Sequence, residues 1–368
     1  MKIAHLTSAH PRFDTRIFVK QCKSLAQAGH QLTLVVADGL GQENIAGIDI
    51  LDVGKVKGRI KRIALSGWRV AHAALAIKAD LYFLHDPELL PYGYWLKKKG
   101  FKVIFDSHED VPTQLLSKPY LKPWILKIIA GVYAGIEKFI TKRLDAVLAA
   151  TPVIRDKFLV LGANSVDVNN FPKLDEFPEP APWEYKTPLV CYVGGIARIR
   201  GAIEMVKAFE HVKAPTQFLL AGNFEDEVLG DEMQSLPAWN KVNYLGFQNR
   251  VGIANTLASS MLGLVTLHPT ANYLEALPVK MFEYMAAGIV VVASDFPLWK
   301  SIIEKAQCGL CVDPLNPAAI AKAIDALLSQ PELAYQMGQR GRQAVLAQYN
   351  WGVEEKKLLD LVQFLEAQ

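Results

Sequence analysis

Residues 274–288, LEALPVKMFEYMAAG, place two carboxylates and a lysine around a predicted helix start. Seven residues separate Glu275 from Glu283, and Lys280 lies between them. The proline before the lysine suits the first turn of a helix, and the final glycine suits its end. Free N–H groups at the start of a helix, with Lys280 nearby, are suited to hold a diphosphate. Glu283 is suited to accept hydrogen bonds from two adjacent sugar hydroxyls. The alternative is an ordinary helix with a favourable acidic first turn and a solvated lysine.

A second segment, YVGGIARIRG at residues 192–201, has the composition of an anion-binding turn. A predicted strand ends before Gly194 and Gly195, and a helix is predicted to begin a few residues later. Glycines let phosphate oxygens approach the backbone, and exposed N–H groups at a helix start favour an anion. Arg198 and Arg200 add two permanent charges that can fork onto phosphate. The alternative is a tight turn with two solvated arginines.

Histidines follow two predicted strands in the first half of the chain. His85 comes directly after LYFL, and His108 comes directly after KVIFDS. Ligands of parallel sheets bind beyond the carboxyl ends of the strands, so both histidines are candidate site residues, although each could instead be a hydrogen-bonded structural residue. The first loop adds four polar residues that could contact a ligand or pair with one another: His10, Arg12, Asp14 and Arg16.

The elements that must position these residues alternate between strand and helix. The segments KIAHLTSA, IFVKQCKSLAQAG and HQLTLVVADG predict a strand, a helix that ends at a glycine, and a second strand, which is a βαβ unit of a parallel sheet. A proline-rich connection near residue 170 interrupts the alternation, which then restarts at LVCYVGG. We therefore predict an α/β protein with two Rossmann-like βαβ domains facing a central cleft. The first strand lacks the G-x-G-x-x-G fingerprint of dinucleotide binding.

Length and charge support two domains. The chain has 368 residues, of which 51% are hydrophobic, and this is too long for one ordinary core. We expect one domain over residues 1–172, a second over residues 173–345, and a terminal helix over residues 346–368. Residues 1–170 carry 24 lysines and arginines against 15 acidic residues, whereas residues 171–368 carry 16 against 22. This asymmetry indicates that the first half meets an anionic partner.

Several classes of protein are disfavoured by what the sequence lacks. Four cysteines agree with a reducing compartment, and the CGLC pair supplies only two of the four ligands of a structural zinc. We find no Asp-x-Asp metal motif, so we expect no metal and no other cofactor. There is no signal peptide pattern and no apolar run of roughly 20 residues, so we expect a cytoplasmic protein. No nucleic-acid-binding module is recognised.

Taken together, these motifs resemble those of glycosyltransferase family 4, whose members have the GT-B fold. The resemblance covers essentially the whole chain. The Glu–seven residues–Glu element of the family is similar to EALPVKMFE, and its V-G-R-L…K-G turn is similar to VGGIARIRG, with Arg200 at the lysine position. Smaller likenesses are HDPELLP at residues 85–91, FDSHED at residues 105–110 and NNFP at residues 169–172.

The resemblance implies a retaining transfer of a sugar from a nucleotide-sugar donor to an acceptor hydroxyl. It implies that Glu283 binds the ribose, and that Arg200 and Lys280 bind the diphosphate. It places Glu275 at the donor sugar and His108 near the transferring sugar. The remaining donor residues would be Gly194, Gly195 and Arg198 at the diphosphate and Gly246 and Phe247 beside the nucleobase. The acceptor side would include His10, Arg12, Asp14, Arg16 and His85.

The sequence departs from the family pattern in three places. Gly195 stands where many members have arginine, and Arg198 could supply that charge instead. The usual EGFGLP is here EALP, two residues shorter before the proline. The first loop, SAHPRFDTR, lacks the usual glycine pair, so the acceptor side could differ.

Residues 118–143 suggest a contact with an anionic membrane surface. Six basic residues accompany Trp124, Ile128, Val132 and Ile136, which recur at helical spacing. Basic charge with an aromatic anchor suits a bilayer surface that contains anionic lipid. The alternative is an amphipathic helix that packs these apolar residues into the core and solvates its other face.

The expected function is therefore a glycosyltransferase that acts in the biosynthesis of a surface polysaccharide, a lipopolysaccharide or a similar glycoconjugate. The donor would be a nucleoside-diphosphate sugar, with UDP favoured over GDP by frequency in the family, and the acceptor a glycan or a lipid-linked sugar. Two alternatives share the fold: an epimerase of nucleotide sugars, which needs no acceptor, and a non-catalytic partner subunit. The charged set Arg198, Arg200, Lys280 and Glu283 argues against the non-catalytic alternative.

Overall fold

The computed structural model describes residues 1–56, 58, 65–116, 122–177, 180 and 187–368. The chain divides into two compact units, of which unit 1 contains Met1–Asn170 with Gly352–Gln368 and unit 2 contains Phe171–Trp351. The sequence analysis placed these boundaries after residues 172 and 345, whereas the chain passes between the units after residues 170 and 351. Among the described helices, none is both long enough and apolar enough to cross a membrane.

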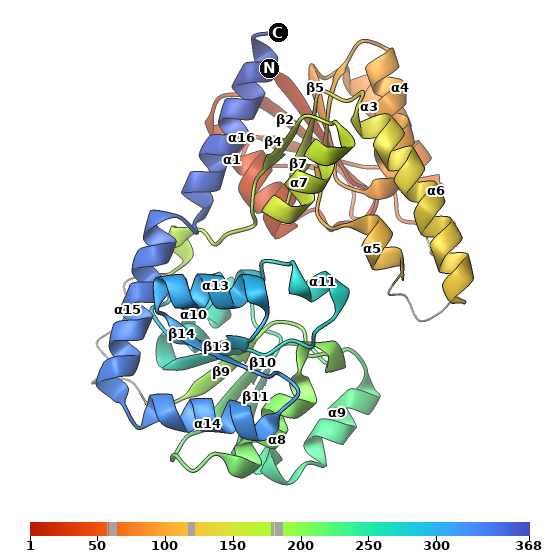
Figure 1. Ribbon diagram of the computed structural model, residues 1–368. Helices are drawn as coiled ribbons and strands as arrows, with labels where there is room; N and C mark the ends of the chain where they lie inside the picture. The colour runs from red at the N-terminus through yellow and green to blue at the C-terminus, as the bar shows by residue number, and fades with distance from the viewer. Residues whose placement is uncertain (57, 59–64, 117–121, 178–179, 181–186) are drawn as a thin grey trace. The chain divides into compact units, whose positions relative to one another are not determined.

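Unit 1 is built on an eight-stranded sheet with the order β3-β4-β2-β1-β5-β6-β7-β8 (Figure 1). Neighbouring strands are parallel except β3 and β4, which are antiparallel. The central strands are almost fully buried, as expected for a parallel sheet that is covered on both faces. The strands are β1 (Lys2–Leu6), β2 (Gln31–Val36), β3 (Glu43–Ile45), β4 (Ile48–Asp52), β5 (Leu81–Leu84), β6 (Lys102–Ser107), β7 (Ala146–Ala149) and β8 (Ser165–Asp167).

Helices cover both faces of this sheet (Figure 1). The first of them, η1, is a wide helix of the π type. Helix α16 follows unit 2 in the sequence, and from Gly352 onward it belongs to unit 1. The helical segments of unit 1 are η1 (Thr15–Cys22), α1 (Lys23–Gln27), α3 (Gly67–Ile77), η3 (Pro87–Leu89), α4 (Leu90–Lys98), α5 (Val111–Leu116), α6 (Pro123–Thr141), α7 (Pro152–Leu161) and α16 (Trp351–Glu366).

Unit 2 is built on a six-stranded parallel sheet with the order β11-β10-β9-β12-β13-β14. Its strands are β9 (Val190–Val193), β10 (Phe218–Ala221), β11 (Val242–Gly246), β12 (Leu262–Val265), β13 (Val290–Ser294) and β14 (Gly309–Val312). Its helical segments are η4 (Leu174–Glu176), η6 (Arg198–Arg200), α8 (Ala202–His211), α9 (Glu227–Gln234), η7 (Pro237–Lys241), α10 (Arg250–Ser259), α11 (Ala271–Leu274), α12 (Val279–Ala286), α13 (Pro297–Ala306), α14 (Pro317–Leu328) and α15 (Pro331–Ala347).

The predicted α/β architecture of two parallel-sheet domains is confirmed. Strands of continuous apolar residues alternate with helices, and glycine or proline stands at turns where the backbone geometry favours it. Helix α12 illustrates the local reasons: Pro278 precedes its first residue, and Gly288 follows its end with φ +66°. Part of the proline-rich connection lies outside the described residues, as does Lys118 of the basic segment.

Candidate active site

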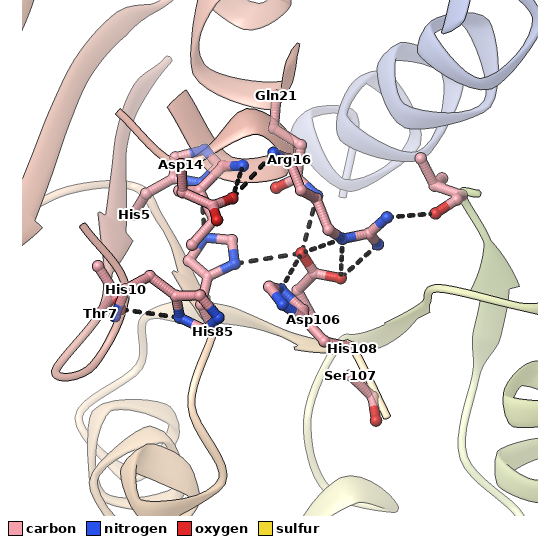
Figure 2. Close-up of polar contacts among 12 residues, drawn as sticks. His5, Thr7, His10, Asp14, Arg16, Gln21, His85, Asp106, Ser107 and His108 are labelled. Atoms are coloured by element: carbon pink, nitrogen blue, oxygen red, sulfur yellow. Dashed lines mark hydrogen bonds and ion pairs between the residues drawn. The ribbon is translucent and has the colours of Figure 1, made fainter. Parts of the chain in front are cut away.

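Asp106, at the end of strand β6, is the centre of a buried polar network in unit 1 (Figure 2). Its carboxylate accepts hydrogen bonds from Arg16, from Gln21 at 2.7 Å, and from two histidines. The closest Arg16 contact, from a guanidinium nitrogen to Oδ1, is 2.6 Å. Burial by itself would raise the pKa of Asp106, but the Arg16 charge and the two histidines hold that pKa well below its usual range. Asp106 is therefore a fixed negative charge at the carboxyl end of the sheet.

The π-type helix η1 explains how two residues of one helix reach the same carboxylate. Arg16 and Gln21 are five residues apart, which is the hydrogen-bonding interval of a π-helix. The two side chains therefore lie on the same side of the helix, one turn apart, and both point to Asp106 (Figure 2). Asp14 caps the same helix, because its carboxylate accepts hydrogen bonds from the backbone N–H groups of Arg16 and Ile17.

Two histidines are oriented by Asp106. His85 Nδ1 lies 3.1 Å from Asp106 Oδ2, and His85 Nε2 lies 2.9 Å from His5 Nδ1. Because His85 Nδ1–H donates to the carboxylate, His85 Nε2 accepts a hydrogen bond from His5 Nδ1–H. Burial lowers the pKa of both rings. His108 Nε2 donates to the same carboxylate at 3.1 Å, and its side chain is one-fifth exposed. Its Nδ1 has no hydrogen-bond partner among the described residues and can accept a proton from a ligand hydroxyl.

His10 stands beside His108, with ring centroids 4.8 Å apart. Its Nδ1 lies 3.1 Å from Asp86, whose carboxylate also accepts from Thr7 and from the backbone N–H of Ser8. Burial alone would raise the pKa of Asp86, but the bond from His10 and these donors lower it to about 2. Burial acts to lower the pKa of His10, and the Asp86 contact outweighs it and raises that pKa.

The four polar residues of the first loop do not pair side chain to side chain, as one alternative supposed. Asp14 caps its own helix, and the other three pair with residues from distant strands or loops. Arg12 is nearly buried and binds Asp38 at 2.7 Å and also Glu43. Arg12 is therefore held in a structural ion pair, whereas His10 remains partly exposed beside His108.

The donor set His85, Asp106 and His108 has the residue types of a metal site, with its ligand atoms within 4.8 Å of one another. The surroundings do not suit a cation. The Arg16 guanidinium already occupies the Asp106 carboxylate, so a divalent ion would be placed against a permanent positive charge. These residues fit an orienting network better than a metal centre.

In unit 2, the turn after strand β9 and the start of helix α12 lie together. A Cβ added at Gly194 would be 3.1 Å from Lys280 Nζ, and one at Gly195 would be 2.7 Å from an Arg200 nitrogen. Gly194 also has φ +118°, which side chains rarely adopt. Arg200 donates to the Gly195 carbonyl at 3.1 Å. The glycines therefore leave room for two cationic groups to approach the same stretch of backbone.

Lys280 carries the least satisfied polar atom of this group. Its Nζ is buried, lies 3.6 Å from the centre of the Tyr192 ring, and has no hydrogen-bond partner among the described residues. Burial, and next the charge of Arg200, hold the pKa of Lys280 well below its usual range, although Glu283 acts in the opposite direction. Buried polar groups are normally hydrogen-bonded, so this nitrogen is suited to a ligand that supplies hydrogen-bond acceptors.

Glu283 lies one turn further along helix α12 and is 6% exposed. Its Oε1 accepts a hydrogen bond of 2.8 Å from Arg250, which also pairs with Glu176. No hydrogen bond to the other oxygen, Oε2, is found within the described part of the chain. Arg250 therefore fixes the carboxylate and leaves one oxygen to accept from a ligand.

The other predicted donor residues have different surroundings. Arg198 pairs with Glu232 of helix α9, so its charge already has a partner. Glu275 is exposed at the end of helix α11, outside the buried group around Lys280. Gly246 ends strand β11 with φ +63°, and Phe247 after it is 71% exposed, as an aromatic platform for a flat ligand would be.

Several residues of both networks were missed by the sequence analysis: Asp106, Asp86, Gln21, Tyr192 and Arg250. Asp106 and Asp86 lie inside the quoted segments FDSHED and HDPELLP. Their positions at strand ends, beside candidate histidines, were the available signal. Arg250 offers no such signal, because it reaches Glu283 from 33 residues away.

Comparison with known proteins also divides the chain into two parts. Residues 15–172 match the family described as glycosyl transferase 4-like domain, and residues 175–344 match glycosyl transferases group 1. The alpha-maltose-1-phosphate synthase of Mycolicibacterium smegmatis is 24% identical over 274 residues, which cover 67% of this chain and 71% of that protein.

Solved structures of similar fold cover the chain from end to end. Sucrose-phosphate synthase from Thermosynechococcus elongatus superposes with a TM-score of 0.78 at 20% identity, covering 100% of this chain and 99% of that one. HepE from Anabaena, solved in complex with UDP-glucose, gives a TM-score of 0.75 at 14% identity and covers 99% of both chains. At these identities, the likeness establishes a shared fold.

Proposed function

Because this protein belongs to the glycosyltransferases of the GT-B fold, with one of the two family domains in each unit, we propose that it transfers a sugar with retention of configuration. The donor in this proposal is a nucleoside-diphosphate sugar, with a UDP-sugar favoured over a GDP-sugar. The acceptor is a hydroxyl of a glycan or of a lipid-linked sugar in the biosynthesis of surface polysaccharide or lipopolysaccharide. The observation that carries the proposal is the buried Lys280 Nζ beside Gly194, for which the described part of the chain offers no hydrogen-bond partner.

Lys280 and Arg200 are suited to stabilise the leaving diphosphate. As the bond between the anomeric carbon and the diphosphate oxygen breaks, negative charge grows on the leaving group. A buried ammonium and a guanidinium held at the glycine turn stabilise that charge without reorganisation, and they do so more strongly in the transition state than in the ground state. Two such cations can take the part that a metal ion plays elsewhere, so we propose a metal-independent reaction.

Retention requires the acceptor oxygen to attack the face that the diphosphate leaves. We propose that the leaving phosphate takes the proton of the acceptor hydroxyl, so that one C–O bond forms as the other breaks and no enzyme nucleophile is needed. Glu275 is exposed at the end of helix α11, which suits contact with the donor sugar better than nucleophilic attack. His108, oriented by Asp106, is the group of unit 1 that we propose acts near the transferring sugar.

We expect UDP to raise the melting temperature of the protein by several degrees in the presence of EDTA, and UMP to raise it much less. Ligand that binds only the folded state adds stability in proportion to the logarithm of its concentration over Kd, about 2.7 kcal/mol at 100 times Kd. The β-phosphate is the part of UDP that Lys280 and the Gly194 turn are expected to hold. Differential scanning fluorimetry with UDP, GDP, UMP and their sugars measures this. Equal shifts for UDP and UMP would contradict the diphosphate assignment. A shift that appears only when magnesium replaces EDTA would contradict the metal-independent reaction.

Replacing Glu283 with glutamine should weaken UDP binding by about tenfold or more, since hydrogen bonds to a charged group contribute about 1.5–3 kcal/mol. The physical reason is the loss of the charged oxygen that Arg250 leaves available for a ribose hydroxyl. Isothermal titration calorimetry with UDP and with 2′,3′-dideoxy-UDP checks this. The variant and the wild type should bind the dideoxy nucleotide with the same affinity, and a tenfold loss for both nucleotides would place Glu283 outside the ribose site.

Transfer itself is tested by release of UDP from a panel of UDP-sugars, with and without glycan and glycolipid acceptors. Release that depends on an acceptor supports the transferase. Conversion of the sugar while it stays attached to UDP, with no acceptor present, would favour the epimerase. Donor binding without any turnover across the panel would favour the non-catalytic subunit.

A further inference from the structure

Helix α6 of unit 1 exposes a row of large apolar side chains. Trp124 is 61% exposed, Ile128 57%, Val132 60% and Ile136 43%. Residues four apart lie on the same side of a helix, so these four side chains form one continuous stripe along α6. Ile129, at 40%, and Phe139, at 49%, widen it. The outer side of α6 is visible in yellow in Figure 1.

The stripe is not the face that packs against the protein. Helix α6 meets unit 1 through a different set of side chains, which are buried: Leu126, Ala130, Glu137, Ile140 and Thr141. Its neighbours are α4, α5 and α7. The alternative in which Trp124, Ile128, Val132 and Ile136 pack into the core is therefore wrong. An exposed apolar stripe of this length is a feature of interaction surfaces.

The charge around the stripe has one sign. Within α6 the single acidic residue is Glu137, which is buried and paired with Lys157. Among the described residues of the helix and its flanks, the exposed charges are all basic: Lys122, Lys127, Lys138, Lys142 and Arg143. Arg143 lies 3.8 Å over the Phe139 ring, so cation and aromatic ring form one amphipathic group.

The end of helix α4 extends the same surface. Trp95 is 39% exposed, and Lys99 lies 5.2 Å over its ring. Lys98 lies over Tyr94, and Tyr94 packs edge-on against Phe139 of α6 at 5.6 Å. The ends of the two helices therefore combine aromatic rings with basic side chains, which is the composition of proteins that lie in the headgroup region of a bilayer.

We propose that this face, formed by the exposed side of α6 and the end of α4, docks unit 1 on the surface of a bilayer that contains anionic lipid. The apolar stripe enters the boundary between headgroups and acyl chains, and the lysines contact the headgroups. The helix lies in the plane of the membrane, because its lysines and its buried glutamate prevent it from spanning. A second copy of the chain is a poorer occupant, since two such faces would bring lysines against lysines.

Co-sedimentation of the ligand-free protein with lipid vesicles tests this docking independently of any transferase activity. We expect binding to phosphatidylcholine vesicles that contain phosphatidylglycerol. The double variant I128E/V132E should reduce the partition coefficient by about tenfold or more, because each glutamate places a charge in the apolar boundary. The variant K127Q/K138Q should reduce it by about tenfold on anionic vesicles and leave binding to pure phosphatidylcholine unchanged.

The control is V160E/V228E, which makes the same chemical change at two valines that are 87% and 69% exposed on α7 and α9. It should bind vesicles as the wild type does. All the substituted side chains are exposed, and equal melting temperatures confirm that each variant folds. Absence of wild-type binding, or an equal loss in the control, would overturn the proposal. A different result would also overturn it. If sedimentation velocity shows a wild-type dimer that is absent in I128E/V132E, and vesicle binding is unchanged in that variant, the occupant of this face is a second copy of the chain.

Discussion

Replacing Lys280 with methionine should weaken UDP binding on the order of 100-fold, since it removes hydrogen bonds between a buried ammonium and a diphosphate. The loss in kcat/KM should be larger, because charge on the leaving group is greatest in the transition state. Methionine keeps the length and apolar stem of the lysine. The free variant should therefore be as stable as the wild type or more so, since it no longer buries a nitrogen that lacks a hydrogen-bond partner among the described residues.

Titration calorimetry gives both signatures of this effect. A diphosphate beside Nζ should raise the depressed pKa of Lys280. At pH values above the free-state pKa, UDP binding should therefore draw protons onto Nζ, and the binding enthalpy there should depend on the ionisation enthalpy of the buffer. This dependence should disappear in K280M. The matched control is Lys300→Met on helix α13, where the side chain is 53% exposed, and it should change neither affinity nor proton uptake. Retention of wild-type UDP affinity by K280M would refute the diphosphate site.

Replacing Asp106 with asparagine should destabilise unit 1 by about 3–5 kcal/mol, the usual cost of removing one partner of a buried ion pair. Arg16 would remain buried beside a neutral amide, whose single carbonyl oxygen cannot accept from Arg16 and from both His85 and His108 as the two carboxylate oxygens do. Chemical denaturation measures the loss. The control, Asp156→Asn, makes the same change in a surface pair with Arg155 and should cost less than about 1 kcal/mol.

The pH dependence separates charge from packing at this position. A carboxylate whose pKa is lowered by folding contributes stability that is fully present above its unfolded pKa, about 3.9, and that is lost as the pH falls toward the folded pKa. The wild type should therefore lose stability in acid more steeply than D106N. If the free energy of unfolding falls equally steeply with decreasing pH in the two proteins, the Arg16–Asp106 pair contributes through shape and not through charge.

The fold was predictable because its signals are local. Continuous apolar strands, glycine stops and proline starts each depend on a few neighbouring residues, and their alternation allows little besides two parallel-sheet domains. Helix α12 was placed from Pro278 and Gly288 alone. The position of Lys280 near its start followed from the same two residues.

The partners of the site residues were not predictable in the same way. The pairing of Arg12 with Asp38 and Glu43 depends on how a loop folds across the end of β2, and Arg250 reaches Glu283 from another helix. The convergence of Arg16 and Gln21 on Asp106 requires a π-type turn, which is rare and has no sequence signature. Charge and spacing in the sequence identified candidate site residues. The tertiary structure determined which of these charged side chains already pair with an oppositely charged residue of the protein.

The return of α16 to unit 1 has a consequence for the order in which the protein folds during synthesis. Glu354 of this helix is buried and accepts a hydrogen bond from the backbone N–H of Asn169, and Lys357 binds Asp167 at the end of β8. These contacts form only after all of unit 2 has been translated. The first half of the chain therefore leaves the ribosome as an incomplete domain, because the helix that contacts β8 is made about 180 residues later. Unit 2 is a continuous segment and can fold as soon as it emerges.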